Sequence, residues 1–233
     1  MSDILIEVES GKSKRLKTAN KLCKDDIVVT GTGGSGGGDN PLRYANNPPK
    51  FMGVTFPEDY ELVLNIPFDF NDNVPTLSCL DMFRATKGCK KIKFIGNEKG
   101  FPFSIRYMFF QNNGTEIFDI SEFKFVPNDV TGGFQQTSLK SIIGKIDSTY
   151  YTTGSFGFST SLVDVGFVPN TIKYSISFGS CLNLSADSIQ SIIDGLADLT
   201  GGTAQTLTFH ATVKGKLTDQ QIATITGKNW SLA

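Results

Sequence analysis

Pairs of apolar residues separated by two positions recur along the middle of the chain. The four pairs are Ile92 with Ile95, Ile117 with Ile120, Leu139 with Ile142, and Leu162 with Val165. Successive pairs begin 25, 22 and 23 residues apart. A period of about 20–29 residues is typical of a solenoid, in which each coil buries its apolar face only against neighbouring coils. We therefore expect residues 50–180 to form a repeat solenoid, which offers a surface rather than a deep catalytic pocket.

An aromatic residue precedes each apolar pair. These residues are Phe83, Phe109, Phe134 and Phe156, and they keep nearly the same period as the pairs. The chain holds 19 Phe but one Trp, and Phe has no polar group that needs a partner. Rings that recur with the structural period predict a stacked core more strongly than an aromatic ligand cage.

The first 30 residues read as a small β-module. Residues 4–9 alternate apolar and polar positions, and residues 26–30 are β-rich. The basic segment 11–24 between them lacks aromatic residues and favours a solvated hairpin over an anionic contact. The glycine run 31–38 resembles a phosphate loop, but Pro41 follows, so no helix begins there. We expect residues 31–49 to be a flexible linker.

The segment after the linker begins with a strand and a run of oxygen-bearing side chains. Residues 60–68 predict an entry strand that ends at Pro67. Residues 69–73, Asp-Phe-Asn-Asp-Asn, carry the oxygen ligands of a calcium loop, yet the glycine and the distal glutamate of an EF-hand are missing. We expect no metal there.

The last 53 residues, 181–233, change pattern and predict a capping unit with two helices. Ser185 is a suitable N-cap for an amphipathic helix over 186–199 that ends at Gly201-Gly202. Residues 206–210 predict a short strand. Thr218 and Gln221 match a capping box for a second helix. A solenoid needs such a unit to cover its last apolar face.

Charge and composition exclude several partners. The net charge of −1 and the pI near 5.9 give no general attraction to nucleic acid. We expect no cleaved signal peptide and no membrane span, because no stretch of the chain has the required apolar length. The four cysteines, Cys23, Cys79, Cys89 and Cys181, lack CxxC spacing and are expected to be reduced. Cys79 and Cys89 could still pair if their coils stack.

With these features in hand, the chain resembles the irregular leucine-rich repeats of BspA-like surface antigens, in the form found in tail proteins of phages and prophages of gut Firmicutes. The residues that carry the resemblance are Leu139-Lys140-Ser141-Ile142, Ser161-Leu162-Val163-Asp164-Val165, Phe167 to Ile172, Leu184 to Ile189, Leu217-Thr218-Asp219 and Trp230. Residues 16–27 also resemble a short phage β-module. Thr137 and Ser159 stand where the repeats often have Cys or Asn. The fold class this implies is α+β, a β-rich leucine-rich-repeat solenoid with a helical C-terminal cap, preceded by a small β-module.

The resemblance implies a virion or extracellular protein that binds a host-surface glycan or protein as part of an oligomer, with a trimer as one option. Residues 1–30 would contact other tail or baseplate proteins. A purely structural tail part and a bacterial adhesin are the alternatives. His210 is the only histidine, no GxSxG or HExxH motif is present, and we expect neither catalysis nor a cofactor. The candidate ligand-binding residues are the aromatics without an obvious core role, Tyr107, Phe110, Tyr150, Tyr151 and Tyr174.

Overall fold

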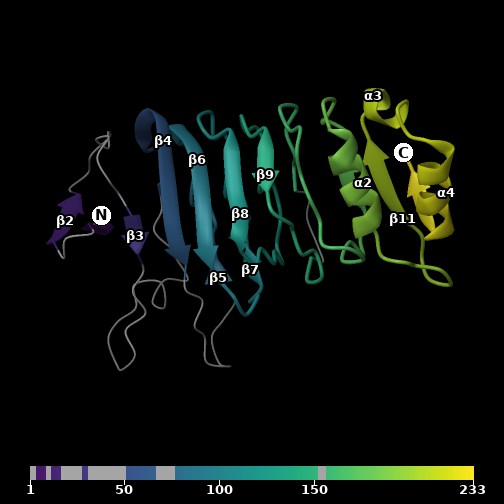
Figure 1. Cartoon of the computed structure of the whole chain (residues 1–233), viewed down its shortest axis with the longest axis horizontal. Coiled ribbons are helices and arrows are strands. Elements are labelled where there is room, and N and C mark those ends of the chain that lie inside the picture. The colour runs from purple at the N-terminus through teal and green to yellow at the C-terminus, as the bar shows by residue number, and fades with distance from the viewer. Residues whose placement is uncertain (1–3, 9–11, 17–27, 31–50, 67–76, 152–155) are drawn as a thin grey trace.

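The computed structural model of the chain describes residues 4–8, 12–16, 28–30, 51–66, 77–151 and 156–233. From β4 to α4 the chain advances along the long axis of the molecule (Figure 1). The described part has mixed α and β content, with parallel sheets and no closed barrel. Each segment of the middle region therefore packs chiefly against the segments before and after it.

The largest sheet has five parallel strands in the order β3-β4-β6-β8-β9. Their bounds are Val28–Thr30, Thr55–Ile66, Lys87–Gly96, Ile117–Phe123 and Ser141–Ile143. A second, two-stranded parallel sheet joins β5 (Leu77–Ser78) to β7 (Phe103–Ser104). At the N-terminus, β1 (Ile4–Val8) and β2 (Lys12–Leu16) form an antiparallel pair, as a hairpin requires.

The strand register corrects the simple repeat of apolar pairs. Ile92 lies opposite Phe118, and Phe118 lies opposite Ile142. Ile117, the expected equivalent of Ile92, instead lies opposite Lys91 and is only half-buried. A phenylalanine has therefore taken the inward position in β8, and the apolar pair there sits one residue out of step with the pair in β6.

The predicted phenylalanine core is confirmed. Successive rings stack at centroid distances of 5.2 Å for Phe83 and Phe109, 5.9 Å for Phe109 and Phe134, and 6.2 Å for Phe134 and Phe156. Phe51 extends the stack at one end. At the other end it continues through Phe158, Phe178 and Phe209. These eight described rings are at most 5% exposed, so the stack is a continuous interior spine.

A column of buried polar side chains runs beside this spine. Its members follow the stacked rings by three positions: Thr86, Asn112, Thr137, Ser159 and Cys181. Asn112 Nδ2 donates to the carbonyl oxygen of Phe83 at 3.3 Å, and the Thr137 and Ser159 hydroxyls lie 3.3 Å apart. Each of these side chains therefore satisfies backbone or neighbouring polar groups that burial would otherwise leave unpaired.

The C-terminal unit contains α2 (Ala186–Gly195), β11 (Gln205–Phe209), α3 (Ala211–Lys214), α4 (Asp219–Gly227) and β12 (Trp230–Leu232). Strand β10 (Ile176–Phe178) pairs with β11 and β11 with β12, all parallel. The predicted Ser185 cap and the capping box of Thr218 with Gln221 are both confirmed.

The predicted end of the first C-terminal helix was wrong. Helix α2 stops at Gly195 rather than near Gly201, and Leu196 pairs with Ile172 in parallel. Backbone hydrogen bonds from Ile172 N–H to Gly195 O and from Ala197 N–H to Ile172 O replace the next helical turn. Pairing with the preceding segment thus overrides the apolar periodicity that continues to Leu199.

The remaining expectations divide between those on the described residues and those outside them. Cys79, Cys89 and Cys181 are free and buried, and burial raises the pKa of the Cys89 and Cys181 thiols to about 12. Cys79 and Cys89 therefore form no disulfide. The segment 69–73, the linker 31–49 and Cys23 lie outside the described residues. Among the described helices, none combines the length and the apolar character that crossing a membrane requires.

Candidate functional site

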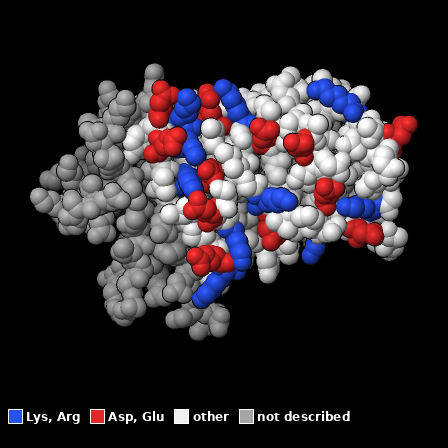
Figure 2. All heavy atoms as spheres, in the orientation of Figure 1, with Lys and Arg blue, Asp and Glu red and all other residues white. Residues whose placement is uncertain are grey.

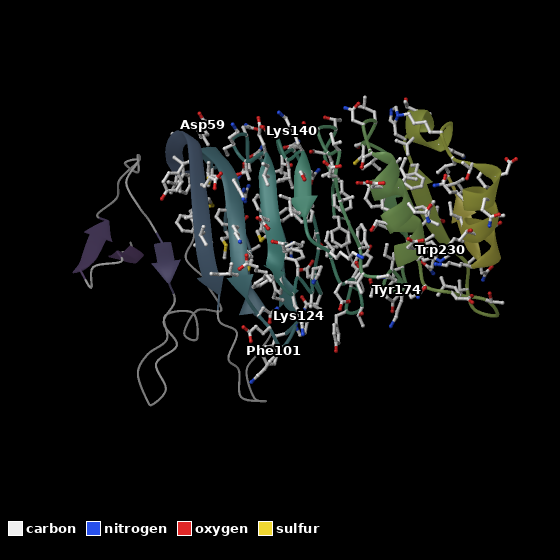
Figure 3. The ribbon with its side chains drawn as sticks, viewed as in Figure 1. Asp59, Phe101, Lys124, Lys140, Tyr174 and Trp230 are labelled. Carbon is white, nitrogen blue, oxygen red and sulfur yellow. The ribbon has the colours of Figure 1, made fainter. Side chains whose placement is uncertain are left out.

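Four of the five predicted aromatic residues form two contacting pairs in the structure. Tyr107 and Phe110 contact each other, with ring centroids 5.5 Å apart. Tyr151 and Tyr174 form the second contact, at 6.1 Å. Tyr150 is 53% exposed whereas Tyr151 is 3% exposed, so one ring of this adjacent pair points outward and the other inward. Figure 3 places Tyr174 at the molecular edge that also carries Phe101 and Lys124, opposite Asp59 and Lys140.

Tyr151 contributes to a hollow of about 140 Å³, which we call the tyrosine pocket. The residues that line it are Tyr151, Phe156, Ser175, Ile176, Ser177, Thr206 and Thr208. Strands β10 and β11 bring the last five together, because Ile176 pairs with Leu207 and the alternate residues of both strands share one face. None of the lining side chains is charged.

Hydrogen bonds fix one wall of the tyrosine pocket. The Tyr151 hydroxyl donates to the carbonyl oxygen of Ser175 at 3.0 Å, and burial raises the pKa of this hydroxyl. The Ser175 hydroxyl donates to Gln205 Oε1 at 2.9 Å and accepts from the Thr206 N–H at 3.0 Å. Tyr151 and Ser175 are therefore held in place before any ligand arrives.

Two hydroxyls of the tyrosine pocket are available to a ligand. The side-chain hydroxyls of Thr206 and Thr208 have no hydrogen-bond partner within the described part of the chain, and both residues are half-buried. A hydroxyl both donates and accepts, and Tyr151 and Phe156, which are 3% and 2% exposed, form an apolar base beside it. The tyrosine pocket thus suits a small, uncharged, polar ligand with an apolar face.

Each ring of the pair Tyr107 and Phe110 lies beside an arginine. We call these four residues the arginine–aromatic cluster: Arg84, Arg106, Tyr107 and Phe110. The Arg84 guanidinium carbon is 5.2 Å from the Phe110 ring centroid, and that of Arg106 is 5.4 Å from the Tyr107 centroid. These distances allow cation–π attraction on both rings. The sequence prediction named the two aromatic residues of this cluster but missed both arginines.

The outward face of the large sheet carries paired charges. Figure 2 shows Lys, Arg, Asp and Glu gathered in a mixed band over β4, β6 and β8, with fewer charges toward the C-terminal end. Lys91 Nζ lies 3.3 Å from Asp119, and Lys93 pairs with Glu122. Cations and anions are interspersed in this band, so their charges largely cancel. The ion pairs stabilise the pairing of neighbouring strands, but the band does not attract ligands of one charge over the other.

The described residues hold no group of three or more His, Cys, Asp or Glu side chains close enough to bind a metal ion. His210 is the N-cap of α3, and its Nδ1 accepts from the Thr212 N–H at 3.2 Å. The ring therefore fills a structural position.

Sequence reasoning missed the serine and threonine hydroxyls of the tyrosine pocket. Their signal is the alternation in 175–178 and in 206–209, where each hydroxyl precedes an apolar residue that points into the core. The pattern predicts two strands with a polar outer face, but only the pairing of β10 with β11 places those faces side by side.

In comparisons with protein-family models, with curated proteins and with solved structures, nothing matches this chain. Its function is therefore argued from the two aromatic sites and the sequence.

Proposed function

We propose that the protein is a non-catalytic binding protein that recognises a host-surface glycan through its tyrosine pocket. The observation that carries this proposal is the combination of the available hydroxyls of Thr206 and Thr208 with an apolar base of Tyr151 and Phe156, with no charged lining residue. Hydroxyls beside an apolar base suit a sugar ring, which has apolar C–H faces and equatorial hydroxyls.

The size of the tyrosine pocket favours one sugar unit. Its volume of about 140 Å³ is well below the roughly 300–1,000 Å³ of pockets that enclose drug-sized ligands. A single monosaccharide at the end or branch of a polymer fits this description better than an extended peptide, which needs a groove. We therefore prefer a glycan to a protein as the ligand.

The setting we propose is the tail or a fibre of a phage, with residues 50–180 forming a leucine-rich-repeat solenoid. The parallel pairing of β4, β6, β8 and β9 and the stacked phenylalanine spine support the solenoid. The phage setting rests on the resemblance of the repeats and of residues 16–27 to such proteins. In this proposal residues 1–30 contact other tail proteins, and the repeats project the tyrosine pocket toward the cell.

Binding to cells tests the proposal directly. Labelled protein is incubated with intact cells of a panel of Gram-positive gut bacteria and with wall polysaccharide purified from each. We expect saturable binding to at least one species and to its polysaccharide. Absence of binding across the panel, together with failed particle assembly when residues 50–233 are deleted, would indicate a purely structural tail part.

A double variant, Thr206→Val with Thr208→Val, tests the tyrosine pocket. Valine preserves the β-branched shape that a strand favours but removes both hydroxyls. The loss of two hydrogen bonds, each contributing about 0.5–1.5 kcal/mol, predicts roughly tenfold weaker polysaccharide binding. Thr203→Val, at an exposed threonine outside the pocket, is the matched control. Unchanged binding by the double variant would rule out the tyrosine pocket as the site.

A further inference from the structure

The arginine–aromatic cluster has features of a second, chemically different binding site. The Tyr107 and Phe110 rings meet edge to face, and an arginine lies over each ring. Both aromatic residues are partly exposed and Arg106 is exposed, so the group reaches the surface. None of these residues lines the tyrosine pocket.

The backbone of Tyr107 is the first observation that singles out this cluster. Its φ of 51° lies in the left-handed region, which is rare for a bulky residue. The corresponding position, two residues before the stacked phenylalanine, is Asp81, with φ 56°, in the preceding coil and Gly132, with φ 61°, in the next coil. Adopting this conformation costs a non-glycine residue on the order of 1 kcal/mol. A tyrosine is thus present where the local geometry favours glycine.

The Tyr107 ring is also held in a fixed position. A Cβ atom added to Gly132 would lie 2.7 Å from the Tyr107 ring and 3.2 Å from the Gln135 side-chain oxygen. The ring therefore rests on the bare backbone of Gly132, beside the Gln135 amide. A ligand that stacks on Tyr107 finds a preorganised surface and loses little side-chain entropy on binding.

The two arginines differ in their electrostatic partners. Arg84 Nη1 lies 3.3 Å from Asp81 Oδ1, so its charge is already compensated. For Arg106 no carboxylate lies within ion-pair distance among the described residues, and its guanidinium carbon lies over the Tyr107 ring, 5.4 Å from the centroid. A stacked guanidinium without an acidic partner keeps its paired N–H donors free for a planar anion.

We propose that the arginine–aromatic cluster binds the carboxylate of an acidic saccharide. Arg106 donates two N–H groups to the carboxylate, and the rings of Tyr107 and Phe110 contact the apolar face of the sugar. The exposed amides of Gln111 and Gln135, on adjacent hydrogen-bonded coils, face the sugar hydroxyls. One uncompensated cation beside two rings fits one carboxylate per sugar unit. An acidic peptide would instead require several free cations.

This inference rests on the proposed role in glycan binding but not on the tyrosine pocket. The tyrosine pocket carries no charge, whereas the cluster selects for an anion. Variants in the two places therefore report separately: loss of acidic-sugar binding with neutral-sugar binding retained identifies a failure of the cluster alone.

Titration calorimetry of the full chain tests the cluster against oligomers of galacturonic, glucuronic and N-acetylneuraminic acid, each beside its carboxyl-reduced form. We expect at least one acidic oligomer to bind and its reduced form to bind at least tenfold more weakly. Arg106→Gln should reduce acidic binding to the level of the reduced form. Arg106→Lys should restore part of the affinity, because lysine keeps the charge without the two-pronged geometry.

Tyr107→Gly provides a variant that the fold accepts, because Gly132 occupies this position in the next coil with the same left-handed backbone. We expect weaker acidic-sugar binding without loss of thermal stability. Lys216→Gln, at an exposed cation of the C-terminal unit, is the control and should bind normally. The proposal is overturned if no acidic oligomer binds, if reduced forms bind equally, if Arg106→Gln changes nothing, or if a polyglutamate peptide binds in place of the sugars.

Discussion

At the scale of single residues, Asn112 has the most demanding position in the buried polar column. Its Nδ2 donates to the Phe83 carbonyl oxygen and to the Thr86 hydroxyl, and its Oδ1 accepts from the Thr115 N–H at 2.9 Å. Asn112→Ala would leave the buried Thr115 N–H without its acceptor. We expect a loss of about 2–4 kcal/mol in the free energy of unfolding, measured by urea denaturation.

The adjacent Asn113 supplies the control for that substitution. It is exposed, and Asn113→Ala should change stability by no more than about 0.5 kcal/mol. Equal effects of the two substitutions would show that the hydrogen bonds of Asn112 to the neighbouring segment contribute little to stability.

Asp119 predicts a dependence of stability on pH. Burial raises the pKa of its carboxyl, but hydrogen bonds from the Ser121 hydroxyl and N–H and from Lys91 outweigh burial, and the net pKa lies below its ordinary value of 3.8. The charged form is therefore favoured by folding. This contribution is fully present above about pH 4 and is lost as the pH falls through the folded-state pKa.

Asp119→Asn tests this pH dependence. Near neutral pH we expect the variant to be about 1–3 kcal/mol less stable than the parent, because the amide loses the charge-assisted bonds. The difference should shrink in acid, where the parent carboxyl is protonated. A constant difference from neutral pH down to about pH 2 would contradict the assignment.

At the scale of elements, Lys228 joins two helices. It follows α4, and its Nζ donates to the carbonyl oxygens of Leu196 at 2.7 Å and Ile193 at 3.2 Å, at the end of α2. A cation there satisfies carbonyls that the helix leaves free and complements its dipole. Lys228→Met keeps the aliphatic stem, and we expect it to cost about 1.5–3 kcal/mol.

The fluorescence of Trp230 during urea unfolding measures the loss of stability caused by Lys228→Met. The indole is 2% exposed, and its N–H donates to the Ala197 carbonyl oxygen at 2.9 Å, close to the junction of the two helices. Lys216→Met, at an exposed lysine, is the control and should leave the transition within about 0.5 kcal/mol. A similar shift in both variants would show that the carbonyl contacts of Lys228 contribute little.

The elements that the sequence predicted correctly are those with local signals. The Ser185 cap and the capping box of Thr218 and Gln221 are bonds within three residues, so short sequence patterns determine them. The end of α2 is set instead by pairing of Leu196 with Ile172, a partner 24 residues away. No pattern inside the helix contains that information.

A better repeat signal was present in the sequence. The pattern Phe-x-x-polar occurs at 83–86, 109–112, 134–137, 156–159 and, with Cys, at 178–181, and it marks both the ring spine and the buried polar column. At β8 the apolar pair in the sequence is offset by one residue from the buried positions, because Phe118 rather than Ile117 lies opposite Ile92. The tyrosine pocket escapes such patterns because its members come from segments far apart in the sequence, whereas in the arginine–aromatic cluster only Arg84 does.

At the scale of the whole molecule, stacked segments predict stability that is partly local. When each coil contacts chiefly its neighbours, the free energy of unfolding approximates a sum of coil and interface contributions. Phe83 precedes β6 in the chain and Trp230 belongs to β12, which pairs with β11, and Figure 1 shows β6 and β11 well apart along the long axis. We therefore expect a substitution at Phe83 to lower the free energy of unfolding less in the C-terminal unit than in the segments around Phe83.

Phe83→Ala tests this prediction. The ring is fully buried between Phe51 and Phe109, and removal of such a ring costs about 3–5 kcal/mol locally. Urea unfolding is followed by far-ultraviolet circular dichroism, which reports all strands, and by Trp230 fluorescence, which reports the C-terminal unit. We expect the dichroism transition to shift to lower urea and broaden, while the fluorescence transition moves less. Phe209→Ala, in β11 beside β12, should reverse the order of the two effects. Equal shifts of both probes in both variants would instead establish a single cooperative unit, in which coupling through the phenylalanine spine exceeds the stability of any one coil.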